Sequence, residues 1–425
     1  MPSDSVMSHS SSVAAPQLPA TQPLTADVAI VGGGIVGLTL ACALQDSGLS
    51  VTVIEAQNWA QAAGRSRAYA MSPLSGRIFA GLGLWEQIAP HITHFERVRL
   101  SDANYPRAVE FLPTDLQIPA VYYAAEHQVL MRALQQRVSQ CPQITVLCST
   151  ELTSVDYRSE GVWLALSDRD QHYELTAGLL VAANGARSQI RQQAGIKTSG
   201  WKYWQSCITA VLAPEQTHDN IAYERFWPSG PFAILPLSDG RCQIVWTAPH
   251  AEAKAVMALP PAQFMAELER RYGDQMGRLQ LVSEPLLFPV QLMQSNAYVK
   301  PRLALVGDAA HCCHPVGGQG LNMGIRDAAA LAQVLQAAHL RGEDIGSLTV
   351  LKRYQRWRRL ENFVVLGFTD FLNRAFSNQW GPLVWLRRRG MWGLQHIRPV
   401  KRLALRLMTG LLGKQPAIAR KNIVL

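Results

Sequence analysis

The residues whose types and spacing best suit a chemical task are three glycines and a glutamate near the N-terminus. Gly32, Gly34 and Gly37 follow the pattern GxGxxG. The first glycine of this pattern allows a tight turn, the second lets the backbone approach a pyrophosphate, and the third lets a helix pack closely on a strand. Glu55 closes the next apolar run, where an acidic side chain can bind ribose hydroxyls and disfavours a 2′-phosphate. The pattern predicts a bound dinucleotide other than NADP.

A βαβ unit must position these four residues. Residues 27–31 form an apolar run of strand type, residues 38–44 are apolar on all sides as in a buried helix, and residues 51–55 form a second strand. This order within a short stretch implies a parallel sheet. Similar buried-strand patterns return at residues 144–147, 179–182 and 303–306. The intervening chain has antiparallel character, for example around the hairpin signal Asp239-Gly240.

Two later segments distinguish FAD from NAD as the dinucleotide. Residues 181–188 read Val-Ala-Ala-Asn-Gly-Ala-Arg-Ser, and residues 306–327 contain Gly-Asp-Ala-Ala-His, Pro-Val-Gly-Gly-Gln-Gly-Leu-Asn and Arg-Asp in that order. With the first motif, these segments resemble the flavin-dependent aromatic hydroxylases, and within them the ring hydroxylases of ubiquinone biosynthesis. The resemblance runs from about residue 27 to at least residue 359. It implies FAD as the cofactor and NAD(P)H as a transient reductant.

The resemblance also assigns roles to residues of the last segment. Asp308 would hold the ribityl chain of FAD, because a carboxylate is a strong acceptor for sugar-like hydroxyls. Gly320, Leu321 and Asn322 would begin a helix whose N-terminal amides face the pyrimidine edge of the flavin. The helix dipole would then stabilise the negative charge of the reduced flavin.

Further contacts are implied around the flavin. Arg67, and a helix bearing Gln128 and Arg132, would contact FAD, with an ordinary surface position as the alternative for Arg132. Pro315 and His314 would lie against the reactive edge of the flavin. There the histidine would either relay a proton or simply pack.

One position departs from the family pattern. The middle motif of the family carries Asp-Gly, whereas this chain has Asn184 before the glycine. Asparagine keeps hydrogen bonding but loses a charge and gains two donors. We expect its role in the fold to survive, and the identity of the electron donor stays open.

The cluster His311-Cys-Cys-His314 could suggest a metal or a reactive thiol. Adjacent cysteines do not easily reach one tetrahedral ion, so we expect no metal. A redox thiol near a helix start is the alternative to two small apolar fillers. Neither a Gly-x-Ser-x-Gly motif nor a second GxGxxG occurs in the sequence, which disfavours a serine hydrolase and a flavoenzyme with two nucleotide folds.

The formal charge of +9 is unevenly placed. Residues 371–425 contain eleven Lys or Arg and no Asp or Glu, so the rest of the chain sums to 9 − 11 = −2. As a helix, residues 396–412 would carry an apolar stripe of Val400, Leu403, Ala404, Leu407 and Leu411, with basic side chains largely away from it. Such a helix near tryptophans is typical of a membrane surface. The alternative is a helix packed on the body, and no motif supports nucleic-acid binding.

Bulk properties limit the remaining choices. No run of about 18 apolar residues occurs, which disfavours a membrane-spanning helix. Residues 1–25 are rich in Ser, Ala, Pro and Thr without the features of a signal peptide, and we expect a disordered leader. Seven cysteines without framework spacing fit a reducing compartment. We expect a cytoplasmic protein, with peripheral attachment to the cytoplasmic face of the membrane as an option.

The expected fold class is α/β, with a discontinuous Rossmann-like FAD-binding domain, an inserted β-rich substrate domain and C-terminal helices. The FAD-binding domain would comprise residues 26–95, 126–198 and 296–346. The substrate domain would comprise residues 96–125 and 199–295, and a helical region with the basic tail would follow at residues 347–425. Ligands usually bind in the crevice between two such domains.

These observations predict an FAD-dependent monooxygenase that uses NAD(P)H and O2 to hydroxylate the ring of a hydrophobic (poly)prenylated phenol in quinone biosynthesis. A multiprotein quinone-biosynthesis complex is a further expected partner. One alternative is a flavin hydroxylase or epoxidase for another lipid or aromatic metabolite, including plastoquinone precursors. A non-catalytic FAD-binding scaffold is the other. The ring position and the oligomeric state stay open.

Overall fold

A parallel sheet forms the first layer of the molecule. The computed structural model describes residues 24–103, 105–168 and 171–420, so most of the expected leader lies outside the described residues. The sheet has the order β18 (Val299–Lys300), β19 (Leu303–Leu305), β11 (Gln171–Ala182), β1 (Leu24–Val31), β2 (Val51–Glu55) and β8 (Ile144–Cys148). The last five are parallel, as the apolar runs predict. An antiparallel hairpin extends β11 through β10 (Val162–Asp168) and β9 (Glu151–Tyr157).

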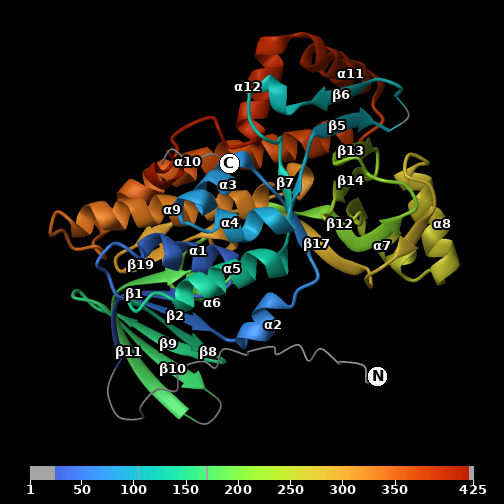
Figure 1. The fold of residues 1–425 in the computed structure, drawn as a ribbon. Helices are drawn as coiled ribbons and strands as arrows, with labels where there is room; N and C mark the ends of the chain where they lie inside the picture. Colours follow the sequence, from blue (N-terminus) through green and yellow to red (C-terminus); the bar gives the residue numbers. More distant parts are fainter. Residues whose placement is uncertain (1–23, 104, 169–170, 421–425) are drawn as a thin grey trace, which may run out of the picture.

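Helix α1 (Ile35–Leu44) is buried on all sides, as its apolar sequence predicts. It packs between α5 (His127–Ser139) and α9 (Gln319–His339) on one face of the parallel sheet (Figure 1). Burial of both faces explains why no polar stripe is present. The shorter helices are α2 (Trp59–Ala63), α3 (Pro73–Gly81), α4 (Trp85–Ile88) and α6 (Gln189–Gln193).

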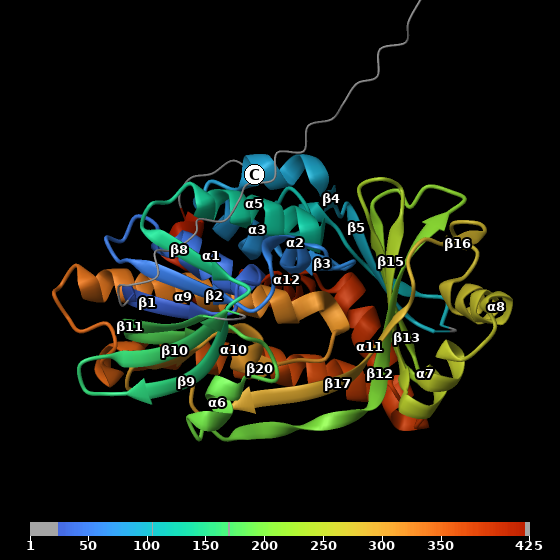
Figure 2. The same ribbon diagram turned by 90° about the horizontal axis from the view of Figure 1, so that it is seen from below.

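A nine-stranded sheet forms the second layer (Figure 2). Its order is β20 (His311–Cys312), β17 (Leu286–Ser295), β12 (Thr198–Pro214), β15 (Cys242–Pro249), β14 (Gly230–Pro236), β13 (Ile221–Trp227), β5 (Arg97–Asp102) and β6 (Ala108–Phe111), with β16 (Leu279–Leu281) beside β12. Strands β14 and β15 form the predicted Asp-Gly hairpin. Helices α7 (His250–Met257) and α8 (Pro261–Tyr272) cover the outer face of this sheet.

A small sheet and two 3-10 turns around β20 connect the two layers. The small sheet consists of β3 (Ala68–Met71), β7 (Tyr123–Glu126) and β4 (Thr93–His94). Strand β20 belongs to the second sheet although its residues fall in a segment expected for the FAD-binding domain. Turns η3 (Gly307–Ala309) and η4 (Val316–Gly318) flank β20, and η5 (Ala417–Arg420) packs on α3 near the C-terminus. Segments far apart in sequence therefore meet where the two sheets join.

Three helices complete the described chain: α10 (Leu348–Phe376), α11 (Gly381–His396) and α12 (Arg398–Met408). Helix α10 packs along α9, and α11 packs on β6 (Figure 1). Prolines occupy the first turn of both α11 and α12, where a missing N–H costs nothing. In the described residues, no helix is long and apolar enough to cross a bilayer.

The buried face of α12 differs from the predicted stripe. Lys401 and Leu405 are the buried residues of this helix, whereas Val400 and Leu403 stay exposed. Lys401 turns inward because its Nζ pairs with Asp115 at 2.7 Å. These two apolar side chains of α12 are thus left exposed.

Candidate active site

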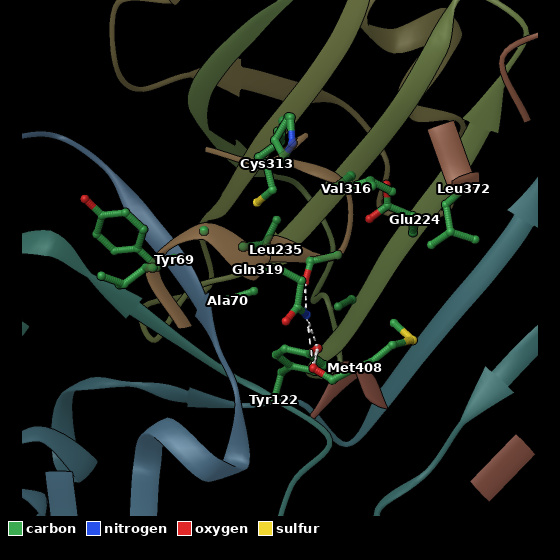
Figure 3. A pocket seen from close by; sticks show the side chains of 18 of the residues that line it. Tyr69, Ala70, Tyr122, Glu224, Leu235, Cys313, Val316, Gln319, Leu372 and Met408 are labelled. Carbon is green, nitrogen blue, oxygen red and sulfur yellow. Dashed lines mark hydrogen bonds between the residues drawn. The ribbon is translucent and has the colours of Figure 1, made fainter. Parts of the chain in front are cut away.

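A cavity of about 950 Å³ lies where the two sheets and the C-terminal helices meet. Its lining includes the glycine turn after β1, the turns η3 and η4, the inner face of the second sheet, and side chains from α10, α11 and α12. Figure 3 shows Tyr69 and Leu372 on opposite sides of it. The lining therefore combines backbone amides and charged groups near the glycine turn, η3 and η4 with apolar side chains from the second sheet and the C-terminal helices.

The glycine turn has the geometry that a pyrophosphate needs. Gly32 has φ +112°, and a Cβ there would lie 2.4 Å from the carbonyl oxygen of Ala183. A Cβ on Gly37 would lie 1.9 Å from the Gly32 oxygen, so only glycine permits this helix–strand packing. Gly34 lines the cavity, and a Cβ there would meet no atom within 4 Å. The backbone is accordingly open to a ligand at Gly34.

Glu55 supports this turn from the end of β2. Its Oε2 accepts a hydrogen bond from Gly33 N–H at 2.7 Å, and its Oε1 accepts one from Gln57 N–H at 2.9 Å. Glu55 does not belong to the cavity lining. The carboxylate thus lies beside the glycine turn, where ribose hydroxyls are expected.

Asp308 projects into the cavity from η3. Its side chain is exposed, but the surface is that of the cavity lining, and burial of the site raises its pKa against the opposing effects of His311 and Arg67. Arg191 donates to the carbonyl oxygens of Ala309 and Ala186, both at 2.9 Å, and so ties this turn to the Asn184 segment. The Asp308 carboxylate is a preformed hydrogen-bond acceptor.

A buried network holds the same turn from behind. Asp327 on α9 accepts hydrogen bonds from Gly307 N–H at 3.2 Å, His311 Nε2 at 2.5 Å and Arg358 Nε at 2.8 Å. Burial alone would raise the pKa of Asp327, but His311 and Arg358 outweigh it and hold the pKa below its usual range. Asp327 therefore stays ionised and fixes the backbone next to Asp308.

The start of α9 presents backbone to the cavity. Gly320 and Leu321 belong to the lining, whereas Asn322 does not. The Asn322 side chain is fully used inside the protein. Its Oδ1 accepts from Ser72 N–H and Ser75 Oγ, both at 2.7 Å, and its Nδ2 donates to the carbonyl oxygens of Ala70 and Gly318 at 2.8 and 2.7 Å. The Asn322 side chain therefore fixes the start of α9, and the backbone that faces the cavity there is that of Gly320 and Leu321.

Pro315 and His314 have different surroundings. Pro315 lines the cavity, but the His314 ring is completely buried away from it, edge-on to Tyr203 with 5.1 Å between centroids. Its Nδ1 accepts a hydrogen bond from Val316 N–H at 3.2 Å. Burial lowers the pKa of His314 to about 3, so the ring is neutral at physiological pH. These surroundings suit the packing alternative better than a proton relay.

Of the remaining predicted FAD contacts, one lies in the cavity and two lie outside it. Arg67 lines the cavity, with its guanidinium 4.9 Å from the centre of the Phe288 ring. Gln128 and Arg132 are exposed on α5 and are not part of the lining. Gln128 Nε2 donates to Glu126 Oε2 at 3.1 Å.

Two cavity residues, Gln319 and Glu224, are not among the contacts that the sequence predicts, although Gln319 lies inside the glycine-rich segment of residues 306–327. Gln319 Nε2 donates to Tyr122 Oη at 2.9 Å and to the Met408 carbonyl oxygen at 3.0 Å, and these bonds link α9 to the end of α12 (Figure 3). Glu224 also lines the cavity, from β13. Sequence spacing could not identify them because the partners are brought together only by the tertiary fold.

The residues present fit FAD. The open backbone at Gly34 suits a pyrophosphate, the free Asp308 carboxylate suits sugar hydroxyls, and the amides at the start of α9 suit a ring edge that becomes negative. Asn184 Oδ1 is buried without a hydrogen-bond partner among the described residues. A bound ligand with donor groups would satisfy this oxygen.

Comparison with known proteins agrees with this geometry. A family model described as an FAD binding domain matches residues 25–364. The chain belongs to this family. It is 38% identical to "Ubiquinone hydroxylase UbiL" of Rhodospirillum rubrum, over 96% of each chain. It is 36% identical to "3-demethoxyubiquinol 3-hydroxylase" of Escherichia coli, over 91% of this chain and 98% of the relative.

The chain is therefore an FAD-dependent monooxygenase. A solved structure with the same fold is that of p-nitrophenol 4-monooxygenase PnpA from Pseudomonas putida, which superposes with a TM-score of 0.79 at 20% identity. The superposition covers 92% of the present chain and 100% of the PnpA chain. The predicted family, α/β fold class and FAD cofactor are confirmed.

Proposed function

We propose that this monooxygenase hydroxylates the aromatic ring of a polyprenylated phenol in the biosynthesis of a ubiquinone-like quinone, with NAD(P)H and O2 as co-substrates. The names of the two relatives support this substrate class. The observation that carries the proposal is the composition of the cavity. One cavity combines the candidate flavin site with a large apolar lining from three C-terminal helices. A phenol with a hydrocarbon tail matches both parts, because its ring must lie near the flavin and its tail can contact the apolar lining.

The apolar part of the cavity reaches the molecular surface. Phe371, Leu386 and Val400 all line the cavity, and they are 63%, 59% and 45% exposed. A side chain that is both exposed and part of the lining marks an opening. A prenyl tail can therefore lie along these residues and extend beyond the protein while the ring stays inside.

The proposed cofactor contacts follow from the site geometry. We assign FAD to the glycine turn, Arg67, Asp308 and the amides at the start of α9, with Glu55 at the ribose and Pro315 near the substrate. Gln128 and Arg132 remain predictions for the outer side of the cofactor. Bound FAD supplies the redox chemistry that activates O2 after reduction by NAD(P)H. The protein holds the phenol near the flavin and excludes water from the reaction.

The proposed domain division follows the two sheets. The FAD-binding domain would consist of residues 26–95, 126–198 and 296–346, around the parallel sheet. The substrate domain would consist of residues 96–125 and 199–295, because β5 and β6 pair into the same sheet as β12 to β17. Residues 347–425 would close the apolar part of the crevice.

We also propose that the opening of the cavity rests on the cytoplasmic face of a membrane that contains anionic lipids. Trp385, Ile397 and Leu403 are exposed beside the opening. Arg389 is exposed on α11, and Arg398, Arg402 and Arg406 are exposed on α12. Apolar side chains surrounded by cations complement an anionic bilayer surface.

Hydroxylation assays with phenols of different tail length test the proposed function. We expect the FAD-loaded protein to incorporate one atom of 18O2 into a prenylated phenol and to oxidise NAD(P)H faster when that phenol is present. The matching phenol without a tail should show a higher KM, because it buries less apolar surface. Parallel assays with NADH and NADPH identify the donor.

The outcomes separate the alternatives. Oxygen transfer to other lipids or tail-free aromatic compounds, without transfer to prenylated phenols, would favour the second type of hydroxylase or epoxidase. If no phenol or donor reduced the bound flavin, the scaffold alternative would replace a catalytic role in quinone biosynthesis.

A further inference from the structure

Glu224 is a carboxylate in the cavity that the assigned cofactor contacts do not use. It lies on β13 in the second sheet and belongs to the cavity lining. Figure 3 shows it beside Val316 of η4, with Leu372 of α10 nearby. Among the described residues of the lining, Glu224 and Asp308 are the only carboxylates. Since Asp308 is assigned to FAD, Glu224 is free for the substrate.

The surroundings of Glu224 contain no cation that neutralises it. Its hydrogen-bond donor is the Gly317 backbone N–H, on the turn between Pro315 and the start of α9. The titratable groups that its charge reaches are Tyr122, which directly precedes β7, and Cys207 from β12. Burial raises the pKa of both groups, so both are neutral near pH 7. Arg387, a cation of the lining, is held by a bidentate pair with Asp102, with distances of 2.7 and 3.1 Å.

The surroundings of Glu224 shift the pKa of its carboxyl group. Burial raises the pKa of Glu224 to about 8, although the hydrogen bond from Gly317 opposes the shift. A carboxyl group whose pKa is close to the working pH can both accept and release a proton efficiently. Its location on β13 also places it beside η4, the turn that we assign to the flavin site, where an aromatic ring must lie to receive oxygen.

We propose that Glu224 binds the ring hydroxyl of the substrate and accepts its proton while the ring is oxygenated. This inference rests on the proposed function. The phenol O–H bond breaks, the proton moves to a Glu224 carboxylate oxygen, and the electron pair passes into the ring. A ring carbon then forms a bond to one oxygen atom of reduced O2 as the O–O bond breaks, and the other oxygen atom leaves as water. The ring carbon loses its proton to solvent, which restores aromaticity, and Glu224 returns a proton to the phenol oxygen. In sum, phenol, O2, NAD(P)H and H+ give the hydroxylated phenol, NAD(P)+ and water.

The substitution E224Q tests this role, because glutamine keeps the size and hydrogen bonding but does not accept the proton. We expect E224Q to retain FAD and to oxidise NAD(P)H, yet to hydroxylate the phenol about 10² to 10⁴ times more slowly. The KM for the phenol should change much less than kcat. E224D, which keeps the carboxyl group in a shifted position, should recover part of the rate.

The pH dependence gives a second readout. The ionised form of Glu224 is the proton acceptor, so the wild-type kcat should rise with pH through about 8, and this rise should disappear in E224Q. In 13C spectra of holoenzyme labelled at glutamate carboxyl groups, E224Q should remove a resonance that titrates in the same range. The matched control is E110Q, on β6 of the same sheet, where Glu110 pairs with Arg97 at 3.4 Å and does not line the cavity.

Two different results would overturn the proposals. If wild-type protein hydroxylates the phenol, and E224Q matches it in rate and pH profile, the role of Glu224 is wrong and the proposed function stands. If wild-type protein hydroxylates no phenol, the proposed function fails and the inference fails with it. E110Q should behave as wild type in either case.

Discussion

Two carboxyl groups, those of Asp308 and Glu224, share one cavity but have different surroundings. Asp308 and Glu224 both line the cavity, and burial raises the pKa of each. Asp308 lies on a turn that Asp327 and Arg191 hold in place, whereas Glu224 lies on a strand and meets a single backbone donor. Ribityl hydroxyls and a phenol are both hydrogen-bond donors. The two acceptors therefore suit two different ligands.

Removal of the Asp308 carboxylate should weaken FAD binding. A hydrogen bond to a charged group contributes about 1.5–3 kcal/mol, so Asp308→Ala should raise the Kd for FAD by roughly tenfold to a hundredfold. Flavin fluorescence quenching measures this Kd, and the absorbance of purified protein gives its FAD content. Asp308→Asn keeps an acceptor and should lose less. An unchanged Kd in Asp308→Ala would remove Asp308 from the cofactor site.

Residues whose role is local could be predicted from the sequence, and residues with distant partners could not. Gly37 is required by the Gly32 oxygen of its own turn, and Gly32 is required by its own positive φ as well as by Ala183 after the neighbouring strand β11. The side chain of Asn322, by contrast, bonds to Ser72, which lies 250 positions earlier in the chain. The sequence motif identifies Asn322 as important, but its side chain holds the protein together and the residue does not line the cavity.

At the scale of elements, side-chain hydrogen bonds at the start of α9 join several segments of the chain. Asn322 joins it to β3 and α3, and Gln319 joins it to Tyr122 and to the end of α12. The apolar runs predicted the parallel strands because burial on both faces removes polar residues. The inserted hairpin β9–β10 was not predicted. Most side chains of β9 are exposed, so this strand lacks an apolar run, whereas those of β10 are buried or half-buried.

Loss of the Asn322 side chain should destabilise the protein. Asn322→Ala breaks four buried hydrogen bonds and leaves their partners unsatisfied, so the free energy of unfolding should fall by about 3 kcal/mol or more. Urea denaturation of the FAD-loaded protein measures the change. His339→Ala, exposed at the other end of α9, should stay within about 0.5 kcal/mol of wild type. Equal stability of the two variants would show that the network contributes little.

At the scale of the whole molecule, the positive charge of the C-terminal region is partly neutralised by acidic side chains of the same chain. Arg387 pairs with Asp102, Lys401 with Asp115 and Arg374 with Asp370. The first two pairs attach α11 to the end of β5 and α12 to the segment after β6, and the third stabilises a turn of α10. The charge that stays exposed surrounds the opening of the cavity. The sequence indicated a basic tail, whereas the fold determines which of its cations are free.

Substitutions on the outer face of α12 should weaken binding to anionic vesicles. Leu403→Glu removes an exposed apolar contact, and Arg406→Glu reverses a charge worth about 1 kcal/mol at a membrane surface. Each should reduce cosedimentation with phosphatidylglycerol-containing vesicles at low salt at least about fivefold. Neither residue lines the cavity, so activity on detergent-solubilised substrate should persist.

The control for this measurement is Lys254→Glu, an exposed cation of α7 on the outer face of the second sheet. It should bind vesicles almost as wild type does. Vesicle binding that is identical in all variants, or that is independent of salt and lipid charge, would contradict the proposed membrane contact. Point substitutions are preferable to truncation because residues of η5 pack against Gly81 of α3.

Because of the opening lined by Phe371, Leu386 and Val400, the reaction rate should depend on the substrate concentration in the bilayer and not on that in bulk solution. A phenol whose tail remains in the bilayer while its ring is in the cavity never becomes a free solute. Its supply then follows its mole fraction among the surrounding lipids, and diffusion takes place in two dimensions. Adding inert lipid at constant total phenol would dilute the substrate for the enzyme, although the bulk concentration in the tube is unchanged.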